Sequence, residues 1–281
     1  MTFPMRDLSL LANLLRDAAI AEIMPRFRNL TAGQIRHKSS VHDLVTDGDE
    51  AAELHITAAL NAAFPGAMVV GEEGTAKDAS VLDGLGDADL AFVIDPIDGT
   101  KNFASGLPLF GVMASVVQRG TIVAGVIYDP IVDDWAMGLR GEGAWLERVD
   151  GRRTDLRVAS AAAPAAMLGM CSWIFMPPPL RSVVTRNLPR VGGAVDYRTA
   201  AHEYRLVAGG HYHFLMFWKL MPWDHAAGWL IHREAGGYGA HFDGSEYNVT
   251  RLEGGLLCAP DKESWRLIHD ALLTSCETRA D

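Results

Sequence analysis

Apolar residues recur at helical spacing in the first part of the chain. Between residues 7 and 24, leucine, isoleucine and alanine return every three or four positions, and Pro25 follows as a stop signal. This pattern predicts an amphipathic helix. A second helix is predicted over residues 51–64, closed by Pro65 and Gly66. The polar residues 37–40 between the two helices predict a loop.

Short apolar runs separated by Gly, Pro and Asp then replace the helical pattern. The predicted strands cover residues 67–70, 90–94, 110–117, 122–128, 135–139 and 144–146. The short spacing between the middle strands favours antiparallel pairing.

Beyond about residue 150 strands and helices alternate. The predicted pairs are residues 195–198 with 199–208, 214–218 with 224–235, and 256–259 with 262–273. The whole pattern predicts a mixed α/β (α+β) fold of layered sheets and helices. A boundary near Gly151 would divide it into an N-terminal unit, residues 1–150, and a C-terminal unit, residues 151–281.

Composition and charge exclude several classes of protein. The 281 residues are 49% hydrophobic, which excludes a disordered chain, and 25 basic against 35 acidic residues give a formal charge of −10. A negative surface repels phosphate backbones, so we expect neither a nucleic-acid polymer nor an anionic membrane as partner. No apolar stretch approaches the roughly 18 residues that a membrane span needs. Cys171, Cys258 and Cys276 lack metal-site or disulfide-framework spacing, and a cytoplasmic location is expected.

Two carboxylates stand at the end of an apolar run. Asp95 and Asp98 flank Pro96 directly after the predicted strand 90–94, and Gly99 follows. Proline restricts the backbone on both sides, so the two acids are rigidly placed and could hold a divalent cation. Gly99 permits close approach of a ligand to backbone N–H groups, which could bind an anion. The alternative is that both acids are ordinary turn residues, as in most Asp-Pro and Asp-Gly pairs.

Further acidic residues favour the metal interpretation. Glu72 and Glu73 follow the predicted strand 67–70, and Asp224 stands at the start of the predicted helix 224–235 as its candidate N-cap. Hard oxygen ligands of this kind suit Mg²⁺. Together the acids predict a phosphate-handling magnesium site.

These motifs, in this order, resemble the inositol monophosphatase family. The likeness includes the segments 71–73, 95–100 and 223–228, and extends to 38–49, 125–128, 141–144 and 234–237. The resemblance implies a layered α/β/α/β/α sandwich, a homodimer, and Mg²⁺-dependent hydrolysis of a small phosphorylated metabolite. It also implies inhibition by Li⁺, with residues 38–49 as a mobile region near a third metal.

Roles for individual residues follow from the same resemblance. Glu72, Asp95 and the Ile97 carbonyl resemble ligands of a first metal, and Asp95, Asp98 and Asp224 those of a second, with Glu72 near a weaker third. Two or three Mg²⁺ ions are therefore expected. Thr100 resembles the water-activating hydroxyl, oriented by Asp49, so the candidate catalytic residues are Thr100, Asp49 and Glu72. Gly99 and Thr100 would bind phosphate through backbone N–H groups.

The substrate is less well defined by the motifs than the reaction. The candidate specificity residues are Lys101, Thr199, Ala200 and Phe217. Lys101 replaces a threonine of animal-type inositol monophosphatases, and Phe217 stands where those enzymes use a glutamate against ring hydroxyls. Histidinol phosphate and nucleoside 3′,5′-bisphosphates are therefore alternative substrates.

Other functions remain as alternatives with distinct consequences. A relative that binds a phosphate ligand without turnover, or a structural cation-binding protein, would retain the acids but release no phosphate. A serine hydrolase or a P-loop kinase is disfavoured, because Gly-x-Ser-x-Gly and Gly-x-x-x-x-Gly-Lys-Ser/Thr are both absent. The pairs His211 with His213 and His225 with His232 lack a further soft ligand at zinc spacing, which favours surface positions or positions next to the site over metal binding.

Overall fold

The computed structural model describes residues 3–40 and 43–274. Its largest sheet has seven strands in the order β3-β4-β5-β6-β7-β8-β9, with only β3 and β4 parallel. These strands are β3 (Met68–Gly71), β4 (Ala91–Asp98), β5 (Gly111–Gln118), β6 (Thr121–Asp129), β7 (Asp134–Leu139), β8 (Gly143–Arg148) and β9 (Arg153–Asp155). The predicted antiparallel pairing of the middle strands is confirmed.

A second sheet has five strands in the order β11-β10-β12-β14-β13. They are β10 (Leu168–Cys171), β11 (Gly193–Val195), β12 (Phe214–Phe217), β13 (Tyr238–His241) and β14 (Leu256–Ala259). The expected boundary at residue 150 falls in the turn between β8 and β9, and β9 still belongs to the first sheet. The division into two units stays a prediction.

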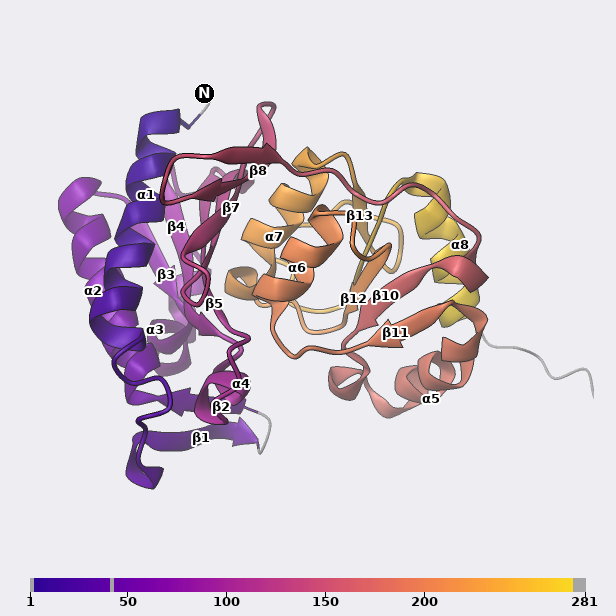
Figure 1. Cartoon of the computed structure of the whole chain (residues 1–281), viewed down its shortest axis with the longest axis horizontal. Helices are drawn as coiled ribbons and strands as arrows, with labels where there is room; N and C mark the ends of the chain where they lie inside the picture. Colours follow the sequence, from indigo (N-terminus) through magenta and orange to yellow (C-terminus); the bar gives the residue numbers. More distant parts are fainter. Residues whose placement is uncertain (1–2, 41–42, 275–281) are drawn as a thin grey trace, which may run out of the picture.

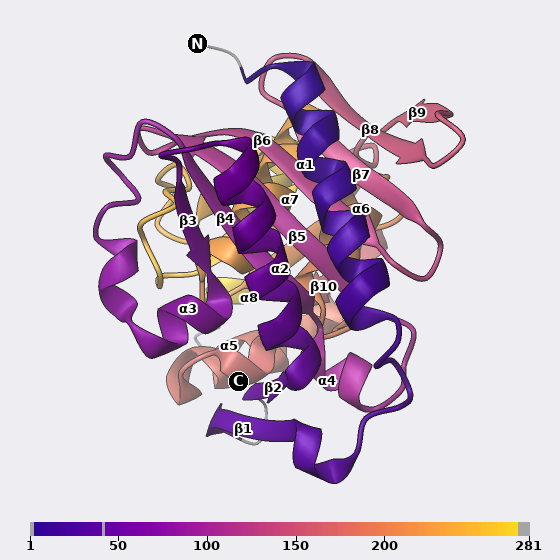
Figure 2. The same ribbon diagram turned by 90° about the vertical axis from the view of Figure 1, so that its left-hand side faces the viewer.

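Helices form three layers around the two sheets (Figure 1). Helices α1 (Met5–Ala18) and α2 (Asp47–Ala63) cross the outer face of the seven-stranded sheet (Figure 2). Helices α6 (Ala200–Ala208) and α7 (Pro222–Glu234) lie between the sheets, and α5 (Pro178–Asn187) and α8 (Lys262–Leu273) cover the far face of the second. The layered α/β/α/β/α sandwich predicted from the sequence is confirmed.

Strand β4 is buried on both faces and separates two of the hydrophobic cores. Phe92 and Ile94 pack into the core beneath α1 and α2, while Ala91 and Val93 pack into the core that contains α6 and α7. Such a strand reads as a continuous apolar run, as residues 90–94 do. Asp95 and Asp98 stand on this rigid strand, so burial on both sides fixes their positions.

Some predicted boundaries shift. The first helix continues as a π-helical turn, Ala19–Ile23, and the predicted loop 37–40 lies in β1 (Ile35–Ser40), which pairs with β2 (Asp43–Thr46). The loop prediction is wrong because residues 36–40 are polar and carry no apolar alternation, so their pairing with β2 leaves no signal in the sequence. Val41 and His42, within the predicted third-metal region, and Cys276 lie outside the described residues. None of the described helices is long and apolar enough to span a membrane.

Candidate active site

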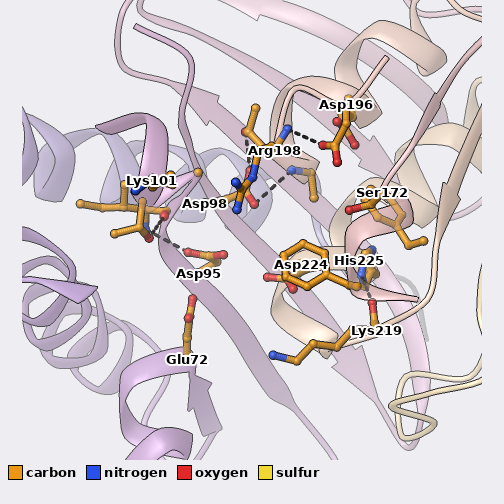
Figure 3. Close-up of a pocket in the computed structure, with 18 of the residues that line it drawn as sticks. Glu72, Asp95, Asp98, Lys101, Ser172, Asp196, Arg198, Lys219, Asp224 and His225 are labelled. Atoms are coloured by element: carbon orange, nitrogen blue, oxygen red, sulfur yellow. Dashed lines mark hydrogen bonds between the residues drawn. The ribbon is translucent and has the colours of Figure 1, made fainter. Parts of the chain in front are cut away.

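Three carboxylates from distant parts of the chain meet at the junction of the two sheets. Glu72 begins α3 (Glu72–Lys77) directly after β3, Asp95 lies in β4, and Asp224 lies in the first turn of α7 (Figure 3). One oxygen from each lies within 4.8 Å of the others. Asp95 is buried, and the other two are half-buried. All three belong to the acids predicted as metal ligands, whereas the fourth, Asp98, is not part of this group.

Burial and mutual repulsion disfavour the charged forms of Asp95 and Asp224 in this cluster. Burial, followed by the charge of Glu72, raises the pKa of Asp95 and that of Asp224 well above the ordinary range. A cation among these oxygens would remove the repulsion. Carboxylate oxygens are the donors that Mg²⁺ prefers, so the residues present fit that ion.

Asp224 does not cap α7, contrary to the prediction. The helix begins at Pro222 after Met221 as N-cap, so Asp224 is its third residue. The reason is that proline suits the first helical position, where no backbone N–H is needed. Its carboxylate still faces the cluster, as Figure 3 shows.

Asp98 lies beside this group but faces the second half of the chain. Its Oδ2 accepts hydrogen bonds from the Thr199 hydroxyl at 2.5 Å and the Ala201 N–H at 2.7 Å, and Oδ1 accepts from the Ala200 N–H at 3.1 Å. The carboxylate therefore stands at the N-terminus of α6, where helix and charge attract each other. Burial nevertheless raises its pKa to about 6. Each carboxylate oxygen has two lone pairs, so these bonds leave room for a metal.

The hydroxyl of Thr100 connects β4 with the start of α2. Thr100 Oγ1 lies 3.1 Å from Asp49 Oδ1 and 3.0 Å from the Ile97 carbonyl oxygen, and can donate to either. The other oxygen of Asp49 accepts from the N–H and hydroxyl of Thr46, which caps α2. Burial raises the pKa of Asp49 to about 7. The predicted pairing of Thr100 with Asp49 is present.

Gly99 turns the chain from β4 into the short helix α4 (Thr100–Ala104). Its φ of 89° lies in the left-handed region that favours glycine. A Cβ there would also lie 3.0 Å from the Thr199 Cβ and 3.1 Å from the Leu109 carbonyl oxygen. The backbone N–H groups of Gly99 and Thr100 consequently stand at a helix start, where the first N–H groups lack intrahelical partners.

Lys38 reaches the cluster from β1. Its ammonium lies 2.7 Å from Glu72 Oε1 and 2.6 Å from Glu73 Oε1. The sequence placed Lys38 in a region near a third metal, and the structure places it against a predicted ligand of that metal.

A cavity adjoins the carboxylates and contains all four candidate specificity residues. Lys101, Thr199, Ala200 and Phe217 line it. Phe217 is also a core residue, with its ring centroid 4.5 Å from that of His225 and 5.7 Å from that of Tyr204. Trp218 and Lys219, which the sequence placed beside Phe217 as further influences on substrate choice, also line it, as does His225. Sequence reasoning did not select several other lining residues: Ser172, Phe175, Asp196, Arg198 and Glu203. They carry no motif; Asp196, Arg198 and Glu203 lie close to Thr199 in the sequence, whereas Ser172 and Phe175 are brought to the cavity by the fold alone.

Comparison with known proteins agrees with this geometry. The family model described as the inositol monophosphatase family matches residues 6–278. An inositol-1-monophosphatase from Mesorhizobium japonicum is 35% identical over 82% of this chain and 83% of its own length. The Nus factor SuhB of Pseudomonas aeruginosa is 34% identical over 86% and 85%.

Solved structures show the same likeness. An inositol monophosphatase from Thermotoga maritima superposes with a TM-score of 0.77 at 26% identity, over 96% of both chains. The extragenic suppressor protein SuhB from Bartonella henselae also gives 0.77, at 27% identity over 95% of this chain and 98% of its own. The chain therefore belongs to the inositol monophosphatase family, whose members are phosphoric monoester hydrolases.

Proposed function

We propose that this protein hydrolyses a small phosphate monoester by Mg²⁺-dependent attack of water. The observation that carries the proposal is the convergence of Glu72, Asp95 and Asp224 oxygens within 4.8 Å, beside the turn at Gly99. A phosphate monoester is a dianion, and an acidic site can accept it only with metal ions present. The same arrangement therefore supports both a metal requirement and a phosphate substrate.

The proposed ligand sets are those that the family resemblance implies, and the grouping of Glu72, Asp95 and Asp224 supports them. Glu72, Asp95 and the Ile97 carbonyl would hold one ion, and Asp95, Asp98 and Asp224 a second, with Asp95 shared. Glu72 would also contact a weaker third ion. Bound Mg²⁺ would supply Lewis-acid stabilisation of the phosphate and acidify a water molecule.

Thr100 and Asp49 would handle the proton of that water. When the Thr100 hydroxyl donates to Asp49 Oδ1, its lone pairs are free to accept a hydrogen bond from water. The proton of the water would then pass through Thr100 Oγ1 to Asp49. Asp49 is suited to hold it, since burial raises the pKa of Asp49 to about 7. The N–H groups of Gly99 and Thr100 would orient the phosphate.

The cavity supports a substrate with an apolar or planar portion. Phe217 offers no acceptor to ring hydroxyls, and an unpaired hydroxyl in a dry site costs about 1–3 kcal/mol. Phe175 and Trp218 add further apolar surface. Histidinol phosphate and nucleoside phosphates therefore rank above inositol-1-phosphate in this proposal.

The remaining proposals rest on the family. A homodimer and inhibition by Li⁺ follow from the resemblance. A cytoplasmic location is also proposed, and it agrees with Cys171 and Cys258, which are free and buried.

Phosphate release tests the proposed function. The purified chain is incubated with inositol-1-phosphate, histidinol phosphate, a sugar phosphate and adenosine 3′,5′-bisphosphate, in Mg²⁺ or in EDTA. We expect release that requires Mg²⁺ and decreases with Li⁺ in the millimolar range. A non-catalytic relative would instead show metal-dependent binding or melting with every rate at background. Inositol-1-phosphate as the best substrate would contradict the substrate ranking.

A further inference from the structure

Three cationic side chains line the cavity beside the acidic cluster. They are Lys101 from α4, Arg198 from the segment before α6, and Lys219 from the segment after β12. Within residues 3–40 and 43–274, none of the three forms an ion pair. Lys38, by contrast, contacts both Glu72 and Glu73. The cavity thus has cations that the protein does not neutralise through direct contact.

The backbone of Arg198 is unusual. Its φ is 58°, in the left-handed region that side chains with a Cβ rarely adopt. Two hydrogen bonds fix the turn: the Arg198 N–H donates to Asp196 Oδ1 at 2.9 Å, and the Tyr197 N–H donates to Glu203 Oε1 at 2.8 Å. Glu203 is itself buried on α6. Residues held in sparsely populated conformations cluster at functional sites.

The side chain of Arg198 is incompletely satisfied. Its Nε is buried and makes no hydrogen bond to any described residue. Buried N–H groups normally have partners, and a guanidinium presents its donors in a fork that matches phosphate or carboxylate oxygens. Arg198 lies between Asp98 and Asp196 in the cavity (Figure 3). A ligand anion is therefore the partner that this geometry lacks.

Arg198 is also firmly connected to the proposed metal site. The next residue, Thr199, donates its hydroxyl to Asp98 Oδ2 at 2.5 Å. The guanidinium is thus held beside the proposed metal site rather than on a free loop. Arg198 lines the same cavity as Glu72, Asp95 and Asp224, so a substrate whose phosphate binds at these acids through metal ions would have its remaining part within that cavity.

We propose that Arg198 is a specificity residue that binds a second anionic group of the substrate. The substrate class is a small organic phosphate that carries a further phosphate or carboxylate. The inference rests on the proposed phosphatase function and goes beyond it, because hydrolysis itself requires only one phosphate. Lys101 and Lys219 make the same cavity more favourable to anions.

Two pairs of compounds isolate the second anion. Adenosine 2′,5′-bisphosphate differs from adenosine 2′-monophosphate by one phosphate, and 2-phosphoglycerate carries a carboxylate in place of one hydroxymethyl group of glycerol 2-phosphate. The measurement is kcat/KM with Mg²⁺ for each compound, expressed as the ratio within a pair. The two pairs also show which anion the subsite prefers.

Arg198→Gly is the first variant, since glycine accepts the left-handed backbone and removes the guanidinium. Arg198→Asn is the second, because asparagine also tolerates that region. The matched control is Arg119→Gly, which removes another arginine of positive φ, 48°, from the turn between β5 and β6, where it pairs with Asp89.

We expect both Arg198 variants to lower the ratio for at least one pair by about tenfold or more, mainly through KM. Arg119→Gly should leave both ratios unchanged. Ratios within about twofold of the parent would overturn the inference, as would an equal loss for both members of each pair, which would show that Arg198 acts through Asp98.

Failure of the proposed function gives a different result. If the parent releases no phosphate from any compound, calorimetric binding of the same pairs in Ca²⁺ replaces the rates. Tighter binding of the second-anion compounds, lost in Arg198→Gly, would support the subsite without catalysis. No such preference in the parent would overturn it.

Discussion

Asp95 is the residue of the site that the proposed function assigns to two metal ions at once. It is buried, stands on a strand enclosed on both faces, and shares its surroundings with the carboxylates of Glu72 and Asp224. Its Oδ1 accepts the Ile97 N–H at 3.0 Å, which fixes the side chain within the turn. Asparagine has nearly the same shape without the charge, so Asp95→Asn tests the role of the charge without removing the side chain from the fold.

We therefore expect Asp95→Asn to fold normally and to lose nearly all activity. Two proposed ions would lose a shared negative ligand at once. Phosphate release is measured across an Mg²⁺ titration, with Asp83→Asn, an exposed aspartate, as the matched control. Activity within about tenfold of the parent, a barrier change of about 1.4 kcal/mol, would contradict the bridging role.

Thr100 tests a different part of the proposal. Removal of its hydroxyl in Thr100→Ala should lower kcat by about 10²- to 10⁴-fold, because the path from water to Asp49 is interrupted. The Mg²⁺ concentration for half-maximal activity should change much less. Thr100→Ser, which keeps a hydroxyl, should recover much of the rate. A normal kcat with weakened Mg²⁺ dependence would instead assign Thr100 to metal binding.

At the scale of elements, the site depends on the ends of strands and helices rather than on their middles. The sequence predicted β4 to end at Ile94, yet it continues to Asp98. A register irregularity between Asp95 and Asp98 in the pairing with β5 accommodates Pro96, which cannot donate to a sheet. Local patterns do not reveal such a bulge, although they do reveal the acids that it positions.

Long-range contacts explain what else the sequence could not predict. The layered arrangement could be predicted, because burial imposes a regular spacing on apolar residues such as Phe92, Ile94 and the leucines of α1. Arg198 gave no signal, because its left-handed backbone depends on Asp196 and on Glu203 of α6. The hydrogen bonds of Asp98 to α6 likewise join residues about a hundred positions apart.

Helix α7 packs so closely on β6 of the large sheet that one added methyl group would clash with its backbone. A Cβ on Gly125 of β6 would lie 2.7 Å from the Ala227 carbonyl oxygen and 2.9 Å from the Ala227 Cα. Both are backbone atoms of α7, so no side-chain rotation can relieve the contact. Gly125→Ala should therefore displace the helix that carries Asp224.

We expect Gly125→Ala to lower the free energy of unfolding by about 1–3 kcal/mol, measured by urea denaturation. The matched control is Gly33→Ala, where the added Cβ meets nothing within 4 Å and φ is not positive. Equal stability of the two variants would show that β6 and α7 can separate without cost. A loss of activity with unchanged stability would point to a displacement of Asp224 alone.

At the scale of the whole molecule, buried acids and buried histidines change the stability of the fold in opposite directions as the pH falls. The carboxylates of Asp95, Asp98 and Asp224 have raised pKa values, so in the absence of metal they bind protons more readily in the folded chain than in the unfolded chain. Their contribution stabilises the fold as the pH falls. Buried histidines contribute with the opposite sign.

His232 on α7 shows that opposite sign most clearly. It is fully buried, neither ring nitrogen has a hydrogen-bond partner among the described residues, and burial lowers its pKa to about 4. The unfolded chain binds this proton near the ordinary pKa of about 6.5, while the folded chain resists it until about 4. Stability is therefore lost as the pH falls through this window, by about 2 kcal/mol at pH 5.

Because the carboxylates act in the opposite direction, the parent alone does not reveal this contribution, but the difference between parent and His232→Leu does. Urea unfolding in EDTA from pH 7.5 to 4.5 should show the variant gaining about 2 kcal/mol on the parent by pH 5, whatever offset the substitution causes at neutral pH. His211→Leu, which removes an exposed histidine, should run parallel to the parent. If the His232→Leu curve also runs parallel, His232 binds its proton equally in both states, and water must reach its ring in the folded protein.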